Sequence, residues 1–518
     1  MKKKRLLALM LAAVAVAGCL TATGCGKNSG SEEGSLDITF YNGGCGDEWL
    51  TNACERYKAI HPEFKYKLTP ETDGSCNAST ILTTGKNVPD IIMGTNLGFS
   101  EFVTSGKIES LEDVYAAKVS TTGGEKTIYE YLSPAARDKY YMQKRAGQTA
   151  YLPWALPWTI LPCAMVYNED VLLTTAHVES GFKVSAERLS GGKWIAPPET
   201  VEELLAYFAD VNAGNATRTT KITPFGWPGT SPNYFFFMLY KWWAEDQGLS
   251  VSNYDGEGSW YDFWNYGNVA TSVTEKQTLS LSVFNQSGQK KAIDTLRSLI
   301  IDKDGKYINS PDKVNSLNIQ QLEQSFVQGK VAIALGSSFI EKEMQNFITK
   351  DTPSFKFMNI PSLNDYTGAD NYCLVNVGEI MYIPSAATDK DLAKKFLIFL
   401  SEESNLVEFS KDTGSLRAFD YDPLSLAKEY KWTEFNKSVM EVYKTSAQLV
   451  DYPKNVADKN LISYVYRYSG QTMFGAMQMA DMLKNLSSMN GETLMAKVIE
   501  ETKDSFDGYK TIYNMNLV

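Results

Sequence analysis

The residues best suited to chemistry in this chain are aromatic rings that lie beside polar side chains. Trp154 and Trp158 stand in a proline-rich segment, and Trp227 lies in a rigid turn that is followed by Asn233 and Tyr234. Small-molecule pockets are mostly apolar walls with a few converging polar groups. Flat rings match the C–H faces of pyranose rings, and polar groups match their hydroxyls. The alternative for each tryptophan is packing inside a hydrophobic core.

A second set of candidates follows the carboxyl ends of predicted strands, where open α/β sheets bind ligands. These candidates are Asp47, Glu48 and Trp49 after a glycine-rich turn, and Thr95 and Asn96 after a later strand. The glycine-rich turn at 43–46 lacks both G-x-G-x-x-G and G-x-x-x-x-G-K-[ST], so we do not expect a phosphate loop. The alternative for this segment is a plain turn with a helix cap.

The sequence offers few residues for a metal site or a hydrolase active site. The two histidines, His61 and His177, are far apart in the sequence, which disfavours a zinc site or a Ser-His-Asp triad. The segment 302–305 lacks the spacing of a calcium loop and predicts a turn. The net charge of −11 disfavours nucleic-acid binding, which needs clustered Lys and Arg. We therefore expect no metal, no cofactor and no nucleic-acid partner.

The N-terminus resembles a bacterial lipoprotein signal. A cationic segment precedes the apolar stretch 6–18, which is short for a membrane span. Cys19 and Cys25 each follow small residues in the spacing of the lipobox, whose cysteine is acylated. We favour Cys25 as the lipid anchor because a flexible polar stretch follows it, with Cys19 as the alternative. The prediction is a signal peptide over 1–24, a tether over 25–35 and a soluble, membrane-anchored body.

The body alternates strand and helix patterns. Apolar runs predict strands near 36–41, 64–68 and 88–94, with an amphipathic helix between the first two. Strand–helix–strand order indicates parallel βαβ units. Thr200 and Glu203 predict a capping box at the start of a further helix. The other predicted elements are a helix at 291–301, a strand at 329–336, a strand at 380–383, a helix at 389–400 and a mostly helical last hundred residues.

Five segments, in this order, resemble the extracellular solute-binding proteins of carbohydrate import, relatives of maltose-binding protein. They are 88–92 (P-D-[IV]), 151–154 (Y-x-[IVL]-P), 165–170 ([IL]-x-Y-N-x-[DE]), 326–333 (F-x-x-G-K-[AV]-A-[MI]) and 383–400 (a strand followed by A-x-x-F-[IL]). The similarity covers nearly everything after the tether. The departures are Cys45, the aromatic stretch 256–267 and a chain longer than is common in the family.

The resemblance implies an α/β fold of the type II periplasmic-binding-protein class, with two lobes, a hinge and a ligand cleft between the lobes. The implied segments are 36–162 plus 384–440 for lobe one and 167–378 plus 456–518 for lobe two, with hinge crossings near 161–166, 378–382 and 440–456. Trp154 and Trp158 would then stand just before the first crossing, and Arg417 would lie in a loop beside the cleft. The alternative for Arg417 is a surface salt bridge.

The resemblance also implies a role. The chain would be a lipid-anchored binding protein on the extracytoplasmic face of the bacterial cell membrane. It would capture a carbohydrate, above all an oligosaccharide, and deliver it to the permease subunits of an ABC importer by hinge closure. We expect a monomer that is not an enzyme. Two alternatives stay open: a binder of peptides or other small solutes on the same scaffold, and an anchored glycoside hydrolase, which would need two carboxylates across a sugar site.

Overall fold

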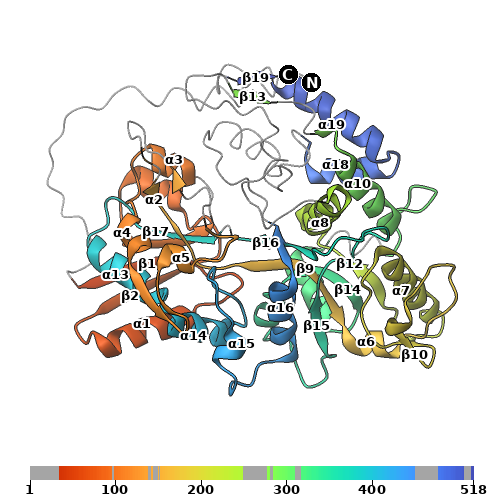
Figure 1. The fold of residues 1–518 in the computed structure, drawn as a ribbon, viewed down its shortest axis with the longest axis horizontal. Coiled ribbons are helices and arrows are strands. Elements are labelled where there is room, and N and C mark those ends of the chain that lie inside the picture. Colours follow the sequence, from red (N-terminus) through yellow and green to blue (C-terminus); the bar gives the residue numbers. More distant parts are fainter. Residues whose placement is uncertain are drawn as a thin grey trace.

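The computed structural model of the protein is a mixed α/β molecule built on two large sheets, each covered by helices (Figure 1). The structure describes residues 34–95, 99–137, 142–143, 150, 152–248, 277–279, 284–309, 317–377, 379–449, 477–506 and 515–517. The predicted signal peptide, Cys19, Cys25, most of the tether and the aromatic stretch 256–267 lie outside the described residues. None of the described helices combines the length and the hydropathy that a bilayer-spanning segment requires.

The first sheet has five strands in the order β2-β1-β3-β17-β8. Its strands are β2 (Lys65–Glu71), β1 (Ser35–Tyr41), β3 (Ile91–Thr95), β17 (Glu379–Tyr382) and β8 (Leu156–Pro157). β1 pairs in parallel with β2 and β3, whereas β17 runs antiparallel to β3 and to β8. The parallel pairing of β1, β2 and β3 confirms the predicted βαβ units.

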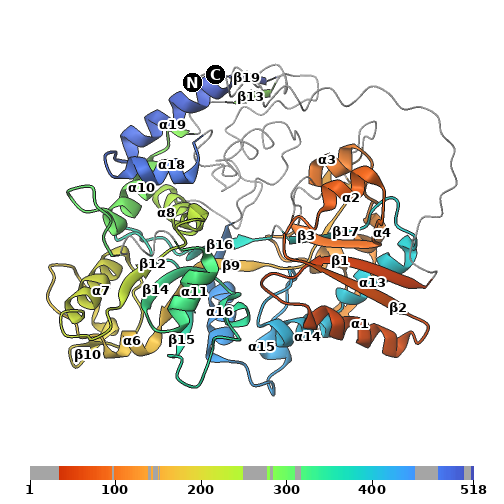
Figure 2. The ribbon, with the colours of Figure 1, turned by 180° about the vertical axis from the view of Figure 1, so that it is seen from behind.

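Both faces of the first sheet are buried, because successive residues of a strand point to opposite faces. Ile91 and Met93 belong to the larger core cluster, whereas Ile92, between them, belongs to a smaller cluster on the other face. The helices on the first face are α1 (Glu48–Ile60), α13 (Lys390–Leu400) and α14 (Glu403–Thr413), and those on the second are α2 (Ala78–Thr84) and α3 (Phe99–Thr104) (Figure 2).

The second sheet has six strands in the order β12-β14-β9-β16-β18, with β15 also paired to β9. They are β12 (Thr223–Gly226), β14 (Val331–Ser337), β9 (Leu161–Asn168), β16 (Tyr372–Asn376), β18 (Ala447–Leu449) and β15 (Phe355–Met358). All eight residues of β9 are buried, because strands flank it on both sides and helices cover the sheet. A continuous apolar run is typical of such a central strand.

Longer helices cover the second sheet and extend from it: α7 (Val201–Gly214), α8 (Phe236–Gln247), α10 (Ser287–Ile300), α11 (Ile319–Val327), α16 (Glu434–Thr445), α18 (Met479–Leu486) and α19 (Gly491–Phe506). The predicted capping box at the start of α7 is confirmed. The Thr200 hydroxyl accepts a hydrogen bond from the N–H of Glu203, and the Glu203 carboxylate accepts one from the N–H of Thr200. This pair satisfies two of the backbone donors that a helix start leaves free.

Shorter elements complete the described fold. The helical turns are α4 (Glu112–Ala116), α5 (Ile128–Tyr131), α6 (Glu169–Thr174), α12 (Ile340–Glu343), α15 (Pro423–Leu426), η1 (Ala186–Arg188) and η2 (Pro232–Phe235). The short strands are β4 (Lys118–Thr121), β5 (Gly124–Thr127), β6 (Met142–Gln143), β7 (Leu152–Pro153), β10 (Leu189–Ser190), β11 (Lys193–Trp194), β13 (Gln277–Leu279) and β19 (Met515–Leu517).

The chain passes between the two sheets three times. The first two passages join β8 to β9 and β16 to β17. The third differs from the expected 440–456, because α16 already packs on β15 of the second sheet. Phe435 contacts Phe355, and the Ser438 hydroxyl accepts a hydrogen bond from the N–H of Phe357. The chain therefore leaves the first sheet before residue 434, since the apolar face of α16 fits the second.

Candidate functional site

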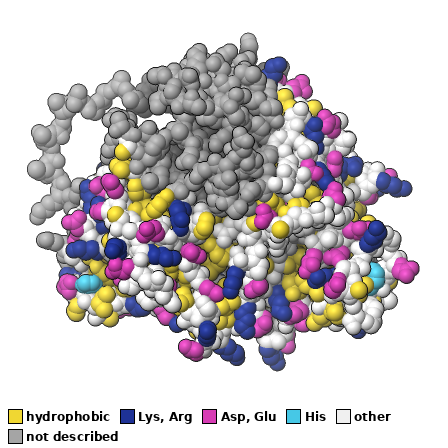
Figure 3. All heavy atoms as spheres, in the orientation of Figure 1, with side chains coloured by type: hydrophobic (Ala, Val, Ile, Leu, Met, Phe, Trp, Pro, Cys, Tyr) yellow, Lys and Arg dark blue, Asp and Glu magenta, His cyan; other side chains and the backbone are white. Residues whose placement is uncertain are grey.

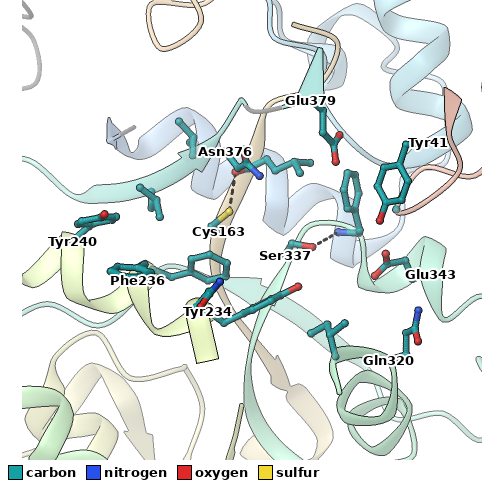
Figure 4. A pocket seen from close by; sticks show the side chains of 18 residues that line it. Tyr41, Cys163, Tyr234, Phe236, Tyr240, Gln320, Ser337, Glu343, Asn376 and Glu379 are labelled. Atoms are coloured by element: carbon teal, nitrogen blue, oxygen red, sulfur yellow. Dashed lines mark hydrogen bonds between the residues drawn. The ribbon is translucent and has the colours of Figure 1, made fainter. Parts of the chain in front are cut away.

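A cavity of about 400 Å³ lies where the chain passes between the two sheets. The first sheet contributes Tyr41 at the carboxyl end of β1, the loop residue Gly44, and Glu379 at the start of β17. The second sheet and its helices contribute the rest of the wall, from β9, η2, α8, α11, β14, α12 and β16 (Figure 4). Carboxyl ends of strands therefore meet at this cavity, as in other open α/β sheets.

Aromatic rings form much of the wall. They are Tyr41, Tyr234, Phe236, Phe237, Tyr240 and Phe339. Phe236 and Tyr240 stand one turn apart on α8, and their rings stack with centroids 5.1 Å apart. Rings at this spacing share one face of a helix, so α8 presents a flat apolar surface to the cavity.

A fully buried ion pair holds α8 in place behind that surface. Lys241 Nζ lies 3.0 Å from Glu245 Oε1, one helical turn along α8. Lys241 also donates to the carbonyl oxygen of Tyr372 in β16, at 3.1 Å. A buried charge pair of this kind needs such further hydrogen bonds, because desolvation opposes it. The pair thus fixes the helix that carries Phe236 and Tyr240 against β16, which also lines the cavity.

The wall also carries four neutral polar side chains, Asn233, Gln320, Ser337 and Asn376. Asn233 and Gln320 are exposed and come from η2 and α11, whereas Ser337 ends β14. Ser337 accepts a hydrogen bond from the N–H of Phe339, which orients the turn that leads into α12 (Figure 4). Amide and hydroxyl groups of this kind can donate to and accept from the hydroxyls of a ligand.

Glu379 is the more deeply buried of the two acids in the wall, with 7 % of its surface exposed. The Thr159 hydroxyl donates to its Oε2 at 2.6 Å. Burial raises the pKa of Glu379 to about 7, the charge of Glu343 adds to this rise, and the Thr159 hydrogen bond opposes it. Figure 4 shows the Glu379 carboxylate and the Tyr41 hydroxyl both directed into the cavity. Glu379 can therefore change its charge near neutral pH.

Glu343, the second acid, ends the short helix α12. Its carboxylate accepts a hydrogen bond from the N–H of Gly44, which connects the first sheet to the second. It is also hydrogen-bonded to the carboxyl of Glu323, on α11. Burial raises the pKa of both acids, and the charge of Glu343 raises that of Glu323 further. Two carboxyls in contact share one proton, because both cannot be ionised at so short a range.

The structure brings two of the predicted site residues, Asn233 and Tyr234, into the cavity wall. Their segment, η2, starts at Pro232, and the proline fixes the turn that presents both side chains. Burial and the charges of Glu323 and Glu343 raise the pKa of Tyr234. The Tyr234 hydroxyl therefore stays protonated and available as a hydrogen-bond donor.

The predicted tryptophans lie in cores and not in the cavity wall. Trp49 and Trp158 are 2 % and 1 % exposed and stack with ring centroids 5.4 Å apart. Trp154 is buried in the smaller core cluster of the first sheet. Trp227 packs against Phe235 in the core beneath the second sheet. In each case the surroundings are those expected for packing.

The remaining predicted site residues also lie away from the wall. Asp47 and Glu48 are exposed at the start of α1, and Glu48 faces Lys342 at 3.4 Å. Arg417 is buried over the ring of Trp49, at 6.0 Å from its centroid, so it does not form a surface salt bridge. Thr95 pairs with Glu379 in the sheet, one strand behind the cavity. Asn96 lies outside the described residues.

The residues that the sequence did not single out include Tyr41, Glu343 and Glu379. The rule that ligands bind at strand ends could have found Tyr41, since it ends the first strand before a glycine-rich turn. Glu379 stands at a predicted passage between lobes, which was a usable signal. Glu343 is the last residue of a four-residue helix that no sequence pattern marks.

The rest of the visible surface gives no competing site. On the face drawn in Figure 3, acidic and basic side chains are interspersed over both halves of the described part. In that same part of the chain, no group of three or more His, Cys, Asp and Glu side chains is arranged to hold a metal ion. The five described cysteines, Cys45, Cys54, Cys76, Cys163 and Cys373, are all buried.

Comparison with known protein families gives a match over most of the chain. The profile of a family described as bacterial extracellular solute-binding protein matches residues 52–420. The match covers both large sheets except β1 and β18, and it includes most of the cavity wall. A search among curated proteins found no match.

Proposed function

Because the chain belongs to the family of bacterial extracellular solute-binding proteins, we propose that it captures a carbohydrate, an oligosaccharide above all, for an ABC importer. The observation that carries this proposal is the composition of the cavity wall. Six aromatic rings and four amide or hydroxyl side chains surround about 400 Å³, a volume suited to one or two sugar rings. Rings can cover the C–H faces of a pyranose, while amides and hydroxyls bond its hydroxyl groups.

The proposed mechanism is hinge closure between two lobes. Its support is that the cavity wall draws on both sheets, while three passages connect these sheets in the described part of the chain. We assign 36–162 and 384–433 to lobe one, and 167–378 and 434–518 to lobe two. A ligand that contacts both lobes stabilises the closed form by its differential affinity for that form. The permease would then recognise the closed form.

The proposed location is the extracytoplasmic face of the cell membrane, with Cys25 as the acylated anchor. The support is the family's extracellular character and the lipobox spacing in the sequence. A tether of about ten residues would leave the body free to reach a permease. We propose that the protein acts as a monomer and carries no enzymatic activity.

A binding screen tests the proposal. The full chain, purified in detergent, is titrated by calorimetry with defined mono- and oligosaccharides and with peptides of similar size. We expect binding of a carbohydrate and recovery of that ligand intact, since a glycoside hydrolase would cleave it. Binding of peptides alone, or cleavage of the sugar, would overturn the proposal.

A matched pair of variants tests whether the ligand binds in the cavity. Tyr234→Ala removes a ring from the wall, and we expect it to weaken binding about tenfold, the effect of losing about 1.4 kcal/mol. Tyr430→Ala removes an exposed tyrosine outside the wall and should leave the affinity unchanged. Equal effects of the two substitutions on affinity would show that the ligand does not bind in this cavity.

A further inference from the structure

Among the described residues, the charged side chains of the cavity wall are all acidic. Glu343 and Glu379 line the cavity, and the described residues that line it include no Lys, Arg or His. Lys342, the residue before Glu343, is paired with Glu48 at the start of α1, with Nζ and Oε2 3.4 Å apart. Within the described residues, the protein therefore supplies no counter-charge for these carboxyls inside the cavity.

One carboxylate oxygen of Glu379 is available to accept a hydrogen bond from a ligand in the cavity. One carboxylate oxygen, Oε2, accepts the hydrogen bond from Thr159, and the other has no partner among the described residues. The side chain is more than nine-tenths buried, and it is directed into the cavity (Figure 4). This oxygen is open to the cavity, so it can accept a hydrogen bond from a ligand group that donates to it.

Glu343 presents a second acceptor across the same space. It holds the Gly44 N–H and is hydrogen-bonded to Glu323, which is 2 % exposed. Glu323 Oε2 is also buried without a partner. The acids thus stand as a cluster of three carboxyls on β17, α12 and α11, beside one cavity.

The rings around these acids suit a cation as well as a sugar face. Tyr41 and Tyr234 both lie close enough to Glu343 for its charge to raise their pKa values, and Phe339 lies on the same turn as α12. A cation over the face of an aromatic ring is attracted by the negative charge of that face. Rings and carboxyls together form the usual surroundings of a bound ammonium group.

We infer that the carbohydrate ligand carries a free ammonium group, so that this site selects amino sugars and rejects sugars that carry a carboxylate or a phosphate. This inference rests on the proposed function. An ammonium group supplies three donors and one positive charge, which match the free oxygen of Glu379 and the charge of the cluster. An anionic sugar would bring a further negative charge into the same desolvated space, which is strongly unfavourable.

Binding of an ammonium group must then be coupled to protons. Among the described residues, the groups that face Glu379 are Thr159, Glu343, Tyr41 and Cys45, and none of these four is a cation. Glu379 therefore keeps a proton in the ligand-free protein up to about pH 7, and a cation would displace that proton. Affinity for an amino sugar should rise as the pH increases towards 7, and binding below that pH should release a proton. A neutral sugar should show neither effect.

Three matched sets of monosaccharides test the inference: glucosamine, galactosamine and mannosamine, each with its N-acetyl form and its neutral parent. Calorimetry of the full chain in detergent is run in two buffers of different ionisation enthalpy, which measures proton release. We expect one amine to bind at least about tenfold more tightly than its N-acetyl form and its neutral parent. Glucuronate should not bind.

Glu379→Gln should weaken binding of that amine roughly thirtyfold or more, because it removes one charge of a desolvated pair. Glutamine keeps an oxygen for Thr159, so the fold is preserved, and Glu343→Gln gives a second test in the opposite wall. Glu341→Gln makes the same chemical change on α12 outside the wall and should leave the affinity unchanged.

The outcomes separate this inference from the proposed function. If a neutral or N-acetylated sugar binds as tightly as its amine, with no proton release, the inference is wrong and the proposed function stands. The same holds if Glu379→Gln and Glu343→Gln leave the affinity for the amine unchanged. If no carbohydrate binds at all, the proposed function itself fails.

Discussion

Two aromatic regions of this molecule serve different ends. In the first sheet, Trp49 and Trp158 stack inside a core, and Arg417 lies over the ring of Trp49. At the passage between the sheets, Tyr234 and its neighbours line a cavity instead. The difference follows from the side chains, since an indole buries a large area in a core, while a tyrosine has an apolar face and a hydroxyl that favours a polar partner. Ring count alone thus predicts a sugar site less well than ring type and position.

The largest expected effect belongs to the tryptophan region. Trp158→Ala should lower the free energy of unfolding by about 3–5 kcal/mol, because it leaves a cavity under Trp49. Urea unfolding followed by fluorescence measures this loss. Affinity for the ligand, measured where the variant is still folded, should be unchanged.

Trp158→Phe is the matched control for this loss. It keeps a ring against Trp49 and removes an indole N–H that is buried without a partner among the described residues, so the loss should be smaller. Reduced affinity with unchanged stability in Trp158→Ala would instead make Trp158 a ligand contact, and the comparison between the two regions would fail.

Most of the fold was predictable because its signals are local. The first three strands and the helices α7 and α13 lie close to their predicted ranges, since period-2 and period-3.6 patterns belong to single segments. The capping box of Thr200 and Glu203 needs only four consecutive residues. The third passage between sheets was misplaced because α16 has an amphipathic face that could pack on either sheet, and only its contact with Phe355 decides.

The cavity was less predictable because its wall joins residues that are far apart in the chain. Tyr41, Tyr234 and Glu379 come from three separate segments, and only the packing of the two sheets brings them together. Asn233 and Tyr234, which line the cavity, could be singled out from the sequence because a turn that contains prolines marks them. The tryptophans could not be assigned from the sequence, because their size suits a core and a sugar platform equally.

The second largest expected effect is the pH dependence of stability that Glu379 causes. Glu379 has its pKa raised to about 7 from an ordinary value of 4.5, so the native state binds more protons than the unfolded state between these values. Stability of the ligand-free protein should therefore fall as the pH rises from about 4.5 to 7 and then level off. Glu379→Gln should be more stable than the wild type by roughly 3 kcal/mol at pH 8 and equal to it at pH 4.5.

Urea unfolding at the two pH values measures this difference. Thr159→Val removes the hydrogen bond that favours the ionised form of Glu379, so the fall in stability should extend to higher pH in that variant. A stability difference for Glu379→Gln that is the same at both pH values would show that Glu379 does not titrate as its burial indicates. The cavity wall would then resemble the tryptophan core in being fixed rather than titratable.

The smallest expected effect tests the part of the wall that the first sheet supplies. Gly44 has φ +72° and lies so close to Phe339 that an added Cβ would stand 2.4 Å from the ring. Gly46 has nearly the same φ, +70°, but its added Cβ would meet only Lys342, at 3.5 Å. Alanine at either position costs on the order of 1 kcal/mol of backbone strain, because a positive φ favours glycine. The two substitutions therefore differ chiefly in the contact with the second sheet.

Gly44→Ala should separate the two walls of the cavity and weaken ligand binding by roughly three- to tenfold, whereas Gly46→Ala should leave it nearly unchanged. Calorimetry measures the affinities, and small-angle scattering with saturating ligand should give a larger radius of gyration for Gly44→Ala alone. The reason is that Phe339 and the N–H of Gly44 join the sheets only when the walls are in contact. Equal affinities of the two variants would mean that the ligand is held by the second sheet alone, and closure would then contribute nothing to binding.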